Sequence, residues 1–343
     1  MNASAGPETG DPPAEAVRGL LRSAGWSEDY RLVRLEGGAN NRVYRLESGA
    51  RSGLLKRYFR HAGDARDRLG AEWGFSSFAW RHGVRALPEP LAANAGAGLA
   101  LYAFVEGRKL LPGEVAAEHV RQAWRFYADV NVHRVQPDAA ALSEASEACF
   151  SVEQHLRTVE RRVERLRALE PASGVNGEAA ALVREALAPA WERVAAGARR
   201  AAKGELAEEL RPDGRRLSPS DFGFHNALLP ADGRLRFLDF EYAGWDDPAK
   251  TVCDFFCQVA VPVPFGLWDE VVRAAARDQA APEHVVRRCQ RLLPVYRVKW
   301  VCIVLNEFLA VGARRRAFAG ESDGEARKQL QLEKARRLLA EIL

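Results

Sequence analysis

The alternation of apolar and polar positions divides the chain into a strand-rich first third and a mostly helical remainder. Short apolar runs typical of strands begin at Tyr30, Val43, Leu54 and Leu99. After Gly107, apolar residues recur mainly at helical spacing. We therefore expect an α+β protein in which a small sheet precedes a larger helical part. In that part, helices are predicted over residues 117–135, 151–169, 177–203 and 297–308.

One helix is predicted inside the first third, over about residues 64–81. Glu72 borders its expected buried face, and the preceding strand, Leu54–Phe59, carries Lys56 in its middle. A strand lysine is commonly a surface residue whose ammonium reaches water, and a helix glutamate is commonly solvated. Taken singly, neither residue indicates a site. The expected buried face consists of Leu69, Trp73, Ser76 and Trp80.

A hairpin is predicted around Asp232-Gly233, a dipeptide that favours a two-residue turn. The resulting register places Asn226 opposite Asp239 in a non-hydrogen-bonded pair, with the two side chains on one face about 4.5–5.5 Å apart. An amide oxygen beside a carboxylate suits Mg²⁺. Asp221 lies five residues before Asn226 and adds a second carboxylate. This is the layout that phosphoryl transfer needs, with a base to orient the hydroxyl and metal ligands beside it.

The segments Leu217-Ser-Pro-Ser-Asp-Phe-Gly-Phe-His-Asn226 and Phe237-Leu-Asp-Phe240 resemble motifs of the aminoglycoside phosphotransferase and choline kinase-like family. That family has a catalytic loop of the form H-G-D-x-x-x-x-N and a strand that ends in I-D-W/F-E. The resemblance implies that Asp221 is the catalytic base and that Asn226 and Asp239 are metal ligands. Pro219-Ser220 replaces His-Gly, so the geometry of this loop is expected to differ.

The same resemblance implies a two-lobed protein-kinase-like fold, with a small, mainly antiparallel lobe, one key helix and a larger helical lobe. Lys56 and Glu72 match the family's strand lysine and helix glutamate, which pair and point at the nucleotide phosphates. A turn containing Gly37, Gly38 and Asn40 is expected to lay backbone N–H groups over those phosphates. Backbone groups from Phe104 to Glu106, in the expected hinge, would bind the adenine edge.

We expect residues 1–14 to form a disordered tail and residues 15–107 a nucleotide-binding lobe. Residues 108–343 would form the helical lobe, with the catalytic loop at 217–240 and the acceptor site. A net charge of +4 spread along the chain, without an aromatic–basic motif, argues against a nucleic-acid partner or a membrane surface. Five cysteines without a C-x-x-C pair favour reduced thiols in a cytoplasmic protein.

The acceptor is expected to bind in the helical lobe. Residues 239–273 carry seven acidic side chains against two basic ones. With nearby tryptophans, this excess could bind a cationic acceptor such as an amino sugar or a choline-like head. Asn306 or Glu307, embedded in an apolar helix, is a further candidate for the acceptor pocket. Residues expected to be structural caps, anchors or packed histidines are Asp247, Asp254, His133 and His225.

These features together predict a phosphotransferase that uses ATP, or another nucleoside triphosphate, with Mg²⁺. Its acceptor would be the hydroxyl of a small polar metabolite, sugar, amino sugar or amino alcohol. Because Pro219-Ser220 departs from the family motif, a biosynthetic or sugar acceptor is favoured slightly over an aminoglycoside. The alternative hypothesis is a nucleotide-binding pseudokinase that acts as a scaffold or regulator.

Overall fold

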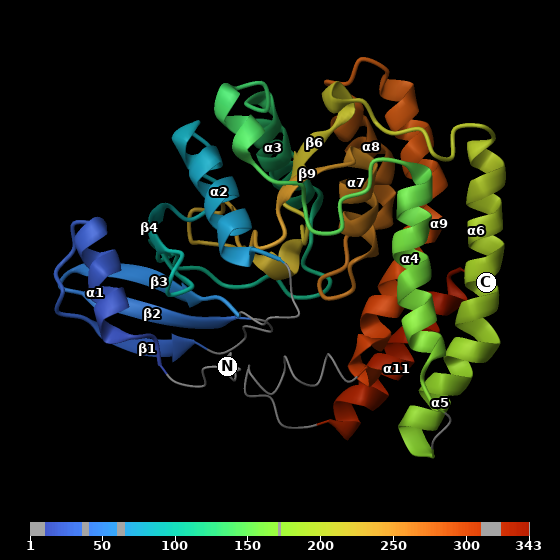
Figure 1. Cartoon of the computed structure of the whole chain (residues 1–343), viewed down its shortest axis with the longest axis horizontal. Helices are drawn as coiled ribbons and strands as arrows, with labels where there is room; N and C mark the ends of the chain where they lie inside the picture. The colour runs from blue at the N-terminus through green and yellow to red at the C-terminus, as the bar shows by residue number, and fades with distance from the viewer. Residues whose placement is uncertain (1–10, 36–40, 60–65, 171–172, 310–323, 343) are drawn as a thin grey trace, which may run out of the picture.

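The computed structural model describes residues 11–35, 41–59, 66–170, 173–309 and 324–342. Figure 1 shows a strand-rich part at one end of the molecule and a larger set of helices at the other. The expected α+β fold, with a small antiparallel sheet and a helical lobe, is confirmed. None of the helices within these ranges is long and apolar enough to cross a bilayer.

The main sheet has the strand order β1-β2-β3-β5-β4, and neighbouring strands are antiparallel. Four of its strands were predicted, whereas β4 and the first helix, α1 (Ala14–Ser23), were not. In β2 buried and half-buried residues alternate, as expected for a strand with two different faces. The strands are β1 (Arg31–Leu35), β2 (Arg42–Ser48), β3 (Arg51–Arg57), β4 (Pro90–Asn94) and β5 (Leu99–Ala103).

The two faces of the sheet carry different helices. Leu99 and Leu101 of β5 pack with α1, whereas Ala100 and Tyr102 pack on the side of helix α2 (Arg68–Arg81). Successive side chains of a strand point to opposite faces, so this alternation places one helix on each. The helix predicted at 64–81 is therefore confirmed from Arg68 onward. α2 lies between the sheet and the helical lobe (Figure 1), and its Phe75 and Phe78 pack in the core of that lobe.

The helical lobe is organised around α9 (Pro282–Leu305), which packs against five other helices within the described ranges. Its apolar residues occur all round the helix, so neighbours must cover it on several sides. α9 begins earlier than the helix predicted at 297–308 and contains Pro294. The five neighbours are α4 (Val152–Arg167), α6 (Ala188–Ala202), α7 (Pro248–Cys257), α8 (Trp268–Ala276) and α11 (Glu325–Ala340).

Two other predicted helices have different boundaries. The helix expected over 117–135 is α3 (Ala117–Val132); Val135 beyond it is 74% exposed, so this residue adds nothing to a buried face. The helix expected over 177–203 consists of α5 (Gly174–Leu182) and α6, joined by a π-helical turn at Val183–Leu187. All five cysteines are free and at least partly buried, in keeping with packed thiols.

The predicted register of the hairpin is wrong by one residue. Strands β7 (Ala227–Leu228) and β8 (Arg236–Phe237) pair Ala227 with Phe237. The amide of Gly233 donates to the carbonyl of Pro230 at 3.1 Å, and Gly233 has φ 71°. This is a type I turn followed by a left-handed glycine, which closes a three-residue loop instead of a two-residue one. Asn226 therefore lies opposite Leu238, whose amide donates to its carbonyl at 2.8 Å.

Candidate active site

Lys56 of β3 and Glu72 of α2 form a buried ion pair. The Lys56 Nζ lies 2.6 Å from Glu72 Oε2, and both side chains are 7% exposed. The hydroxyl of Tyr58 donates to the same glutamate oxygen at 2.8 Å. Glu72 lies within the buried face of α2 and not at its border, because this face runs through Leu69, Glu72, Ser76 and Ala79. Trp73 and Trp80, which were expected in it, are only half-buried.

Asp239 joins this pair although the predicted register was wrong. It follows β8 with φ 65°, a left-handed conformation that ends the strand, and its Oδ1 accepts a hydrogen bond from Lys56 Nζ. Asn226 is oriented differently, since its Nδ2 donates to the backbone carbonyl of Asp221 at 3.0 Å and to Oδ2 at 3.2 Å. The fold thus brings Lys56, Glu72 and Asp239 into contact and connects Asn226 to Asp221.

Three carboxylates act on the ammonium group of Lys56. We call these four residues, Lys56, Glu72, Asp239 and Glu241, the lysine cluster. Burial opposes the charge of Lys56, but Asp239, Glu72 and Glu241 outweigh it and raise its pKa. Burial raises the pKa of Glu72 to about 7, against the effect of Lys56. Burial and the charge of Glu241 likewise raise the pKa of Asp239. Glu241 has partners of its own, among them Arg68 at 3.7 Å. The single charge of Lys56 therefore faces two carboxylates, buried Glu72 and half-buried Asp239, whose pKa values stay raised.

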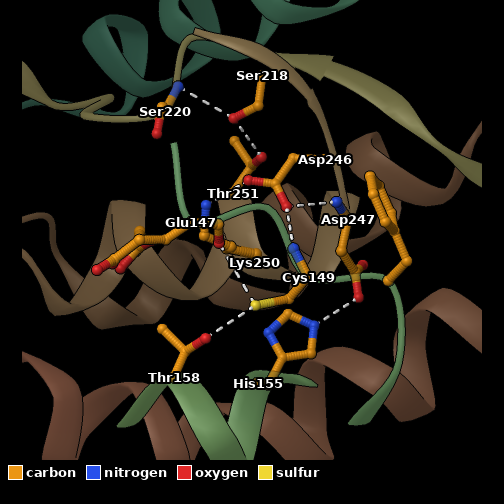
Figure 2. A network of polar contacts seen from close by, with 12 residues as sticks. Glu147, Cys149, His155, Thr158, Ser218, Ser220, Asp246, Asp247, Lys250 and Thr251 are labelled. Atoms are coloured by element: carbon orange, nitrogen blue, oxygen red, sulfur yellow. Dashed lines mark hydrogen bonds and ion pairs between the residues drawn. The ribbon is translucent and has the colours of Figure 1, made fainter. Parts of the chain in front are cut away.

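The loop before Asp221 is supported by hydroxyl groups where the family has His-Gly. Ser218 Oγ accepts from the amide of Ser220 at 3.0 Å and from Thr251 Oγ1 of α7 at 2.9 Å (Figure 2). Ser220 has φ 67°, a conformation that glycine adopts without steric cost. The glycine of the family motif thus coincides with a left-handed position. Asn131 of α3 holds the preceding strand through paired hydrogen bonds of 2.9 Å with Leu217.

Asp221 contacts a histidine that was expected to be a packed structural residue. His225 Nε2 lies 3.2 Å from Asp221 Oδ1. Burial raises the pKa of Asp221, but His225, Asn226 and Lys299 outweigh burial, so the pKa lies below its ordinary value. Asp221 is therefore ionised near neutral pH. The other histidine, His133, stacks on His82 with ring centroids 4.9 Å apart, as a packed residue does.

The expected hinge follows β5 and connects to the hairpin through mutual backbone hydrogen bonds between Arg108 and Leu229, at 3.1 and 2.8 Å. The amide of Phe104 donates to the Ser52 carbonyl at 3.2 Å. Arg45 lies 4.5 Å above the Phe104 ring and 3.2 Å from Glu106. The role of Phe104 and Glu106 in nucleotide binding remains a prediction. Gly37, Gly38 and Asn40 lie outside the described residues.

A cavity of about 240 Å³, here called the α7–α9 pocket, adjoins Asp221. Asn306 lines it, whereas Glu307 is buried and lies 3.3 Å from Arg327; a role of either residue in acceptor binding remains a prediction. Asp247 caps α7 as predicted, accepting from the amide of Ala249 at 2.7 Å. The pocket is lined by Arg66, Ser146, Glu147, Arg162, Ser220, Asp221, Phe222, Tyr242, Lys250, Asp254, Lys299, Trp300, Ile303 and Asn306.

Asp254 was expected to be a helix cap or a loop anchor, and it anchors other side chains but from within a helix. It lies inside α7 and accepts from Lys299 Nζ, at 2.9 and 2.8 Å, and from Trp300 Nε1 at 2.8 Å. The pocket also contains three residues that were not predicted from the sequence: Lys250, Glu147 and Arg162. Asp246 and Lys250 are four residues apart at the start of a helix, which is a recognisable ion-pair spacing. The other pairs join residues distant in sequence and had no such signal.

Comparisons with known proteins identify the class. A model of the phosphotransferase enzyme family matches residues 31–289. A choline kinase from Cryptosporidium parvum has the same fold, with 9% identity over 96% of each chain and a TM-score of 0.58. A macrolide 2′-phosphotransferase from Brachybacterium faecium is 19% identical over 90% of this chain and 99% of its own, with a TM-score of 0.56. No curated protein sequence matched the chain significantly.

A spectinomycin phosphotransferase in complex with ADP and spectinomycin gives a TM-score of 0.57, with 12% identity over 96% of this chain and 98% of its own. The fold is therefore that of the protein-kinase-like small-molecule kinases. Because the family model spans most of the chain, this protein belongs to the phosphotransferase enzyme family, whose members phosphorylate hydroxyl groups of small molecules.

Proposed function

We propose that this protein transfers the γ-phosphoryl group of ATP, or of another nucleoside triphosphate, to a hydroxyl group of a small polar acceptor in a Mg²⁺-dependent reaction. The observation that carries this proposal is the position of Asp221. It lines the α7–α9 pocket, and its charge also raises the pKa of Asp239 in the lysine cluster. A carboxylate between a cationic phosphate-binding group and a small cavity is where an acceptor hydroxyl would meet the phosphoryl group.

The residues present fit a divalent cation bound together with phosphates. The described residues contain no group of three or more His, Cys, Asp or Glu side chains that could hold a metal ion by themselves. Asn226 and Asp239 would hold Mg²⁺, with phosphate oxygens as the remaining ligands. The raised pKa values of Glu72 and Asp239 support this assignment, because an added cation lowers the repulsion between neighbouring carboxylates. When bound, the metal supplies positive charge that neutralises the phosphates.

In the proposed reaction, Lys56 binds the nucleotide phosphates and Glu72 positions Lys56. Asp221 is ionised and accepts the proton of the acceptor hydroxyl as the oxygen forms its bond to the γ-phosphorus. The bond from that phosphorus to the bridging oxygen breaks, and the nucleoside diphosphate leaves with the bonding electrons. His225 and Asn226 hold Asp221 in place through contacts of 3.2 Å each.

Phosphoryl transfer can be tested with ATP and Mg²⁺ across a panel of sugars, amino sugars, hydroxy acids and amino alcohols, by detecting the phosphorylated acceptor. Asp221→Asn should lower kcat for the acceptor by about 10²–10⁴-fold while nucleotide affinity stays nearly unchanged. Asp269→Asn, on the exposed start of α8, is the matched control. A large loss of nucleotide affinity with kcat retained would contradict the assignment of Asp221 as the base.

A pseudokinase that acts as a scaffold or regulator is the second candidate, because Pro219-Ser220 replaces the usual His-Gly. The hydroxyl support of this loop by Ser218 and Thr251 argues against it. A pseudokinase would bind nucleotide but show no acceptor-dependent turnover in the same panel, with or without Asp221.

A further inference from the structure

The carboxylates of the α7–α9 pocket already have partners within the protein. Glu147 Oε2 lies 2.5 Å from Arg162 Nη2. Both oxygens of Asp254 accept from Lys299. Both oxygens of Asp221 are within hydrogen-bond distance of His225 or Asn226. Among the described residues, Glu147 Oε1 is the one carboxylate oxygen lining this pocket that has no hydrogen-bond donor. An ammonium ligand would therefore find few acceptors.

The cations of the same pocket have donors to spare. An ammonium has three N–H donors and a guanidinium has five. Lys250 uses one of them on Asp246, and Lys299 uses two on Asp254. Arg162 donates from Nη2 to Glu147, while its Nε is buried without a partner. Lys250 and Lys299 are both at least nine-tenths buried, so each unused donor is costly unless a ligand or water satisfies it.

The three cations are close enough to act on one group. Burial raises the pKa of Glu147, yet Arg162, Lys299 and Lys250 outweigh burial and bring this pKa to about 2. The ammonium of Lys250 donates to Oδ2 of Asp246. Oδ1 of the same carboxylate accepts from the amides of Cys149 at 3.1 Å and Asp247 at 2.9 Å (Figure 2). The ammonium is thus fixed in place before any ligand binds.

We propose that the acceptor is a small hydroxy compound that bears an anionic group, either a carboxylate or a phosphate. This inference rests on the proposed kinase function. The anionic group binds Lys250, Lys299 and Arg162 while a hydroxyl of the same molecule reaches Asp221. Charged oxygens match these donors, since hydrogen bonds between ionised partners are shorter and stronger than neutral ones. The cavity of about 240 Å³ is smaller than the roughly 300–1,000 Å³ typical of drug-sized ligands, which favours a monosaccharide-sized acceptor or a smaller one.

The test uses two acceptor series, each with a constant carbon skeleton. The hexose series contains glucuronate, glucose 6-phosphate, glucose and glucosamine, and the three-carbon series contains glycerate, glycerol 3-phosphate and glycerol. Both kcat/KM for phosphoryl transfer and ligand protection against thermal unfolding are measured. We expect at least one anionic member to exceed its neutral counterpart about tenfold or more in kcat/KM. Carboxylate and phosphate members distinguish the two forms of the anion.

Two variants, Lys299→Gln and Arg162→Gln, connect this preference to the pocket. Each should lower the ratio of kcat/KM for the anionic acceptor to that for the neutral one by roughly 10–100-fold. Arg162→Gln keeps the test valid if Lys299→Gln, which leaves Asp254 without its lysine, does not fold. Arg199→Gln removes a positive charge at an exposed position of α6 and should leave the ratio unchanged.

The outcomes separate this inference from the proposed function. Transfer to neutral or cationic members at least as efficient as transfer to their anionic counterparts overturns the anionic acceptor and leaves the kinase intact. Saturable binding of an anionic member that depends on Lys299 or Arg162, without transfer to any acceptor, supports the anion site and contradicts the kinase. If no anionic member is bound or phosphorylated better than its neutral counterpart, the inference is wrong.

Discussion

The lysine cluster and the α7–α9 pocket, which Asp221 lines, carry charge in opposite ways. In the lysine cluster, burial and neighbouring carboxylates raise the pKa values of Glu72 and Asp239. In the pocket, neighbouring cations lower the pKa of Glu147 to about 2 against the effect of desolvation. Asp246, which accepts from the pocket residue Lys250, is an exception, because burial raises its pKa against the effect of that lysine.

This difference indicates which ligands each region can accept. Carboxylates whose pKa values are raised favour an added cation, as a metal bound with phosphates would provide. Paired carboxylates beside cations with unused donors favour an added anion. Asp221, with contacts to His225 and Asn226, belongs electrostatically to the second region but also acts on Asp239. The opposite character of the two regions thus suits a reaction in which the metal-bound nucleotide and the acceptor approach from different sides.

The largest expected effect comes from Asp239→Asn, which removes charge from the lysine cluster with little change in volume. We expect Mg²⁺-dependent turnover to fall on the order of 10³-fold, because the ligand that would hold positive charge against the phosphates is lost. Circular dichroism and thermal unfolding should show an intact fold. A folded variant with near-normal turnover would exclude Asp239 as a metal ligand.

A double-mutant cycle of Lys56→Met and Glu72→Gln tests whether the lysine cluster acts as one unit. Lys56→Met should lower kcat/KM for the nucleotide more than Glu72→Gln does, since Glu72 acts through Lys56 at 2.6 Å. The double variant should lose less than the sum of the two single losses, with a coupling of about 0.5–3 kcal/mol. Strict additivity of the logarithms of kcat/KM would show that the contact has no role in catalysis.

Much of the lysine cluster could be predicted from the sequence, because its residues lie in short motifs that resemble those of a known family. The Lys56–Glu72 contact was predicted from the family resemblance, which both residues match in type, order and separation, and it is present. The contact of Asp239 with Lys56 did not follow from the predicted register, which was wrong by one residue. The left-handed conformation at Asp239 redirects its side chain after β8, and such a conformation at a residue other than glycine has no reliable sequence signal.

The acceptor side was much less predictable. The excess of acidic residues over 239–273 suggested a cationic ligand. This segment does not contain Arg162, which lies 77 positions before it, or Lys299, which lies 26 positions after it. These two cations reach the pocket from α4 and α9. Their pairing with Glu147 and Asp254 depends on how helices pack and not on local sequence. The charge of a pocket built from distant helices therefore required the tertiary structure.

The opposite pKa shifts predict opposite dependences of stability on pH. Glu72 has a raised pKa in the folded state, so the stability that its protonated form contributes is lost as pH rises from about 4.5 through 7. Fully buried Asp247 has a pKa of about 2, lowered by Arg288 and His155 against burial. The stability that it contributes, about 2 kcal/mol, is present above pH 4 and lost as pH falls towards 2.

These dependences can be measured by urea unfolding of the nucleotide-free protein over that pH range. Relative to the wild type, Glu72→Gln should gain stability as pH rises from 4.5 to 7. Asp247→Asn should be less stable at neutral pH but lose less of its stability on acidification. Parallel curves for either variant and the wild type would show that the corresponding carboxyl group does not titrate as described.

The smallest expected effect is at Ser220, which precedes Asp221 and lines the α7–α9 pocket. A φ of 67° costs a residue with a Cβ atom about 1–2 kcal/mol of steric strain. Glycine avoids this strain but loses more backbone entropy on folding. Ser220→Gly should therefore raise the free energy of unfolding by about 0.5–1 kcal/mol. Ser220→Ala keeps the strain and serves as the matched control. Because Ser218 and Thr251 support the loop before Asp221 from the side of α7, the KM for the nucleotide should change little in either variant. If Ser220→Gly is less stable than Ser220→Ala, Ser220 does not adopt the left-handed conformation in solution.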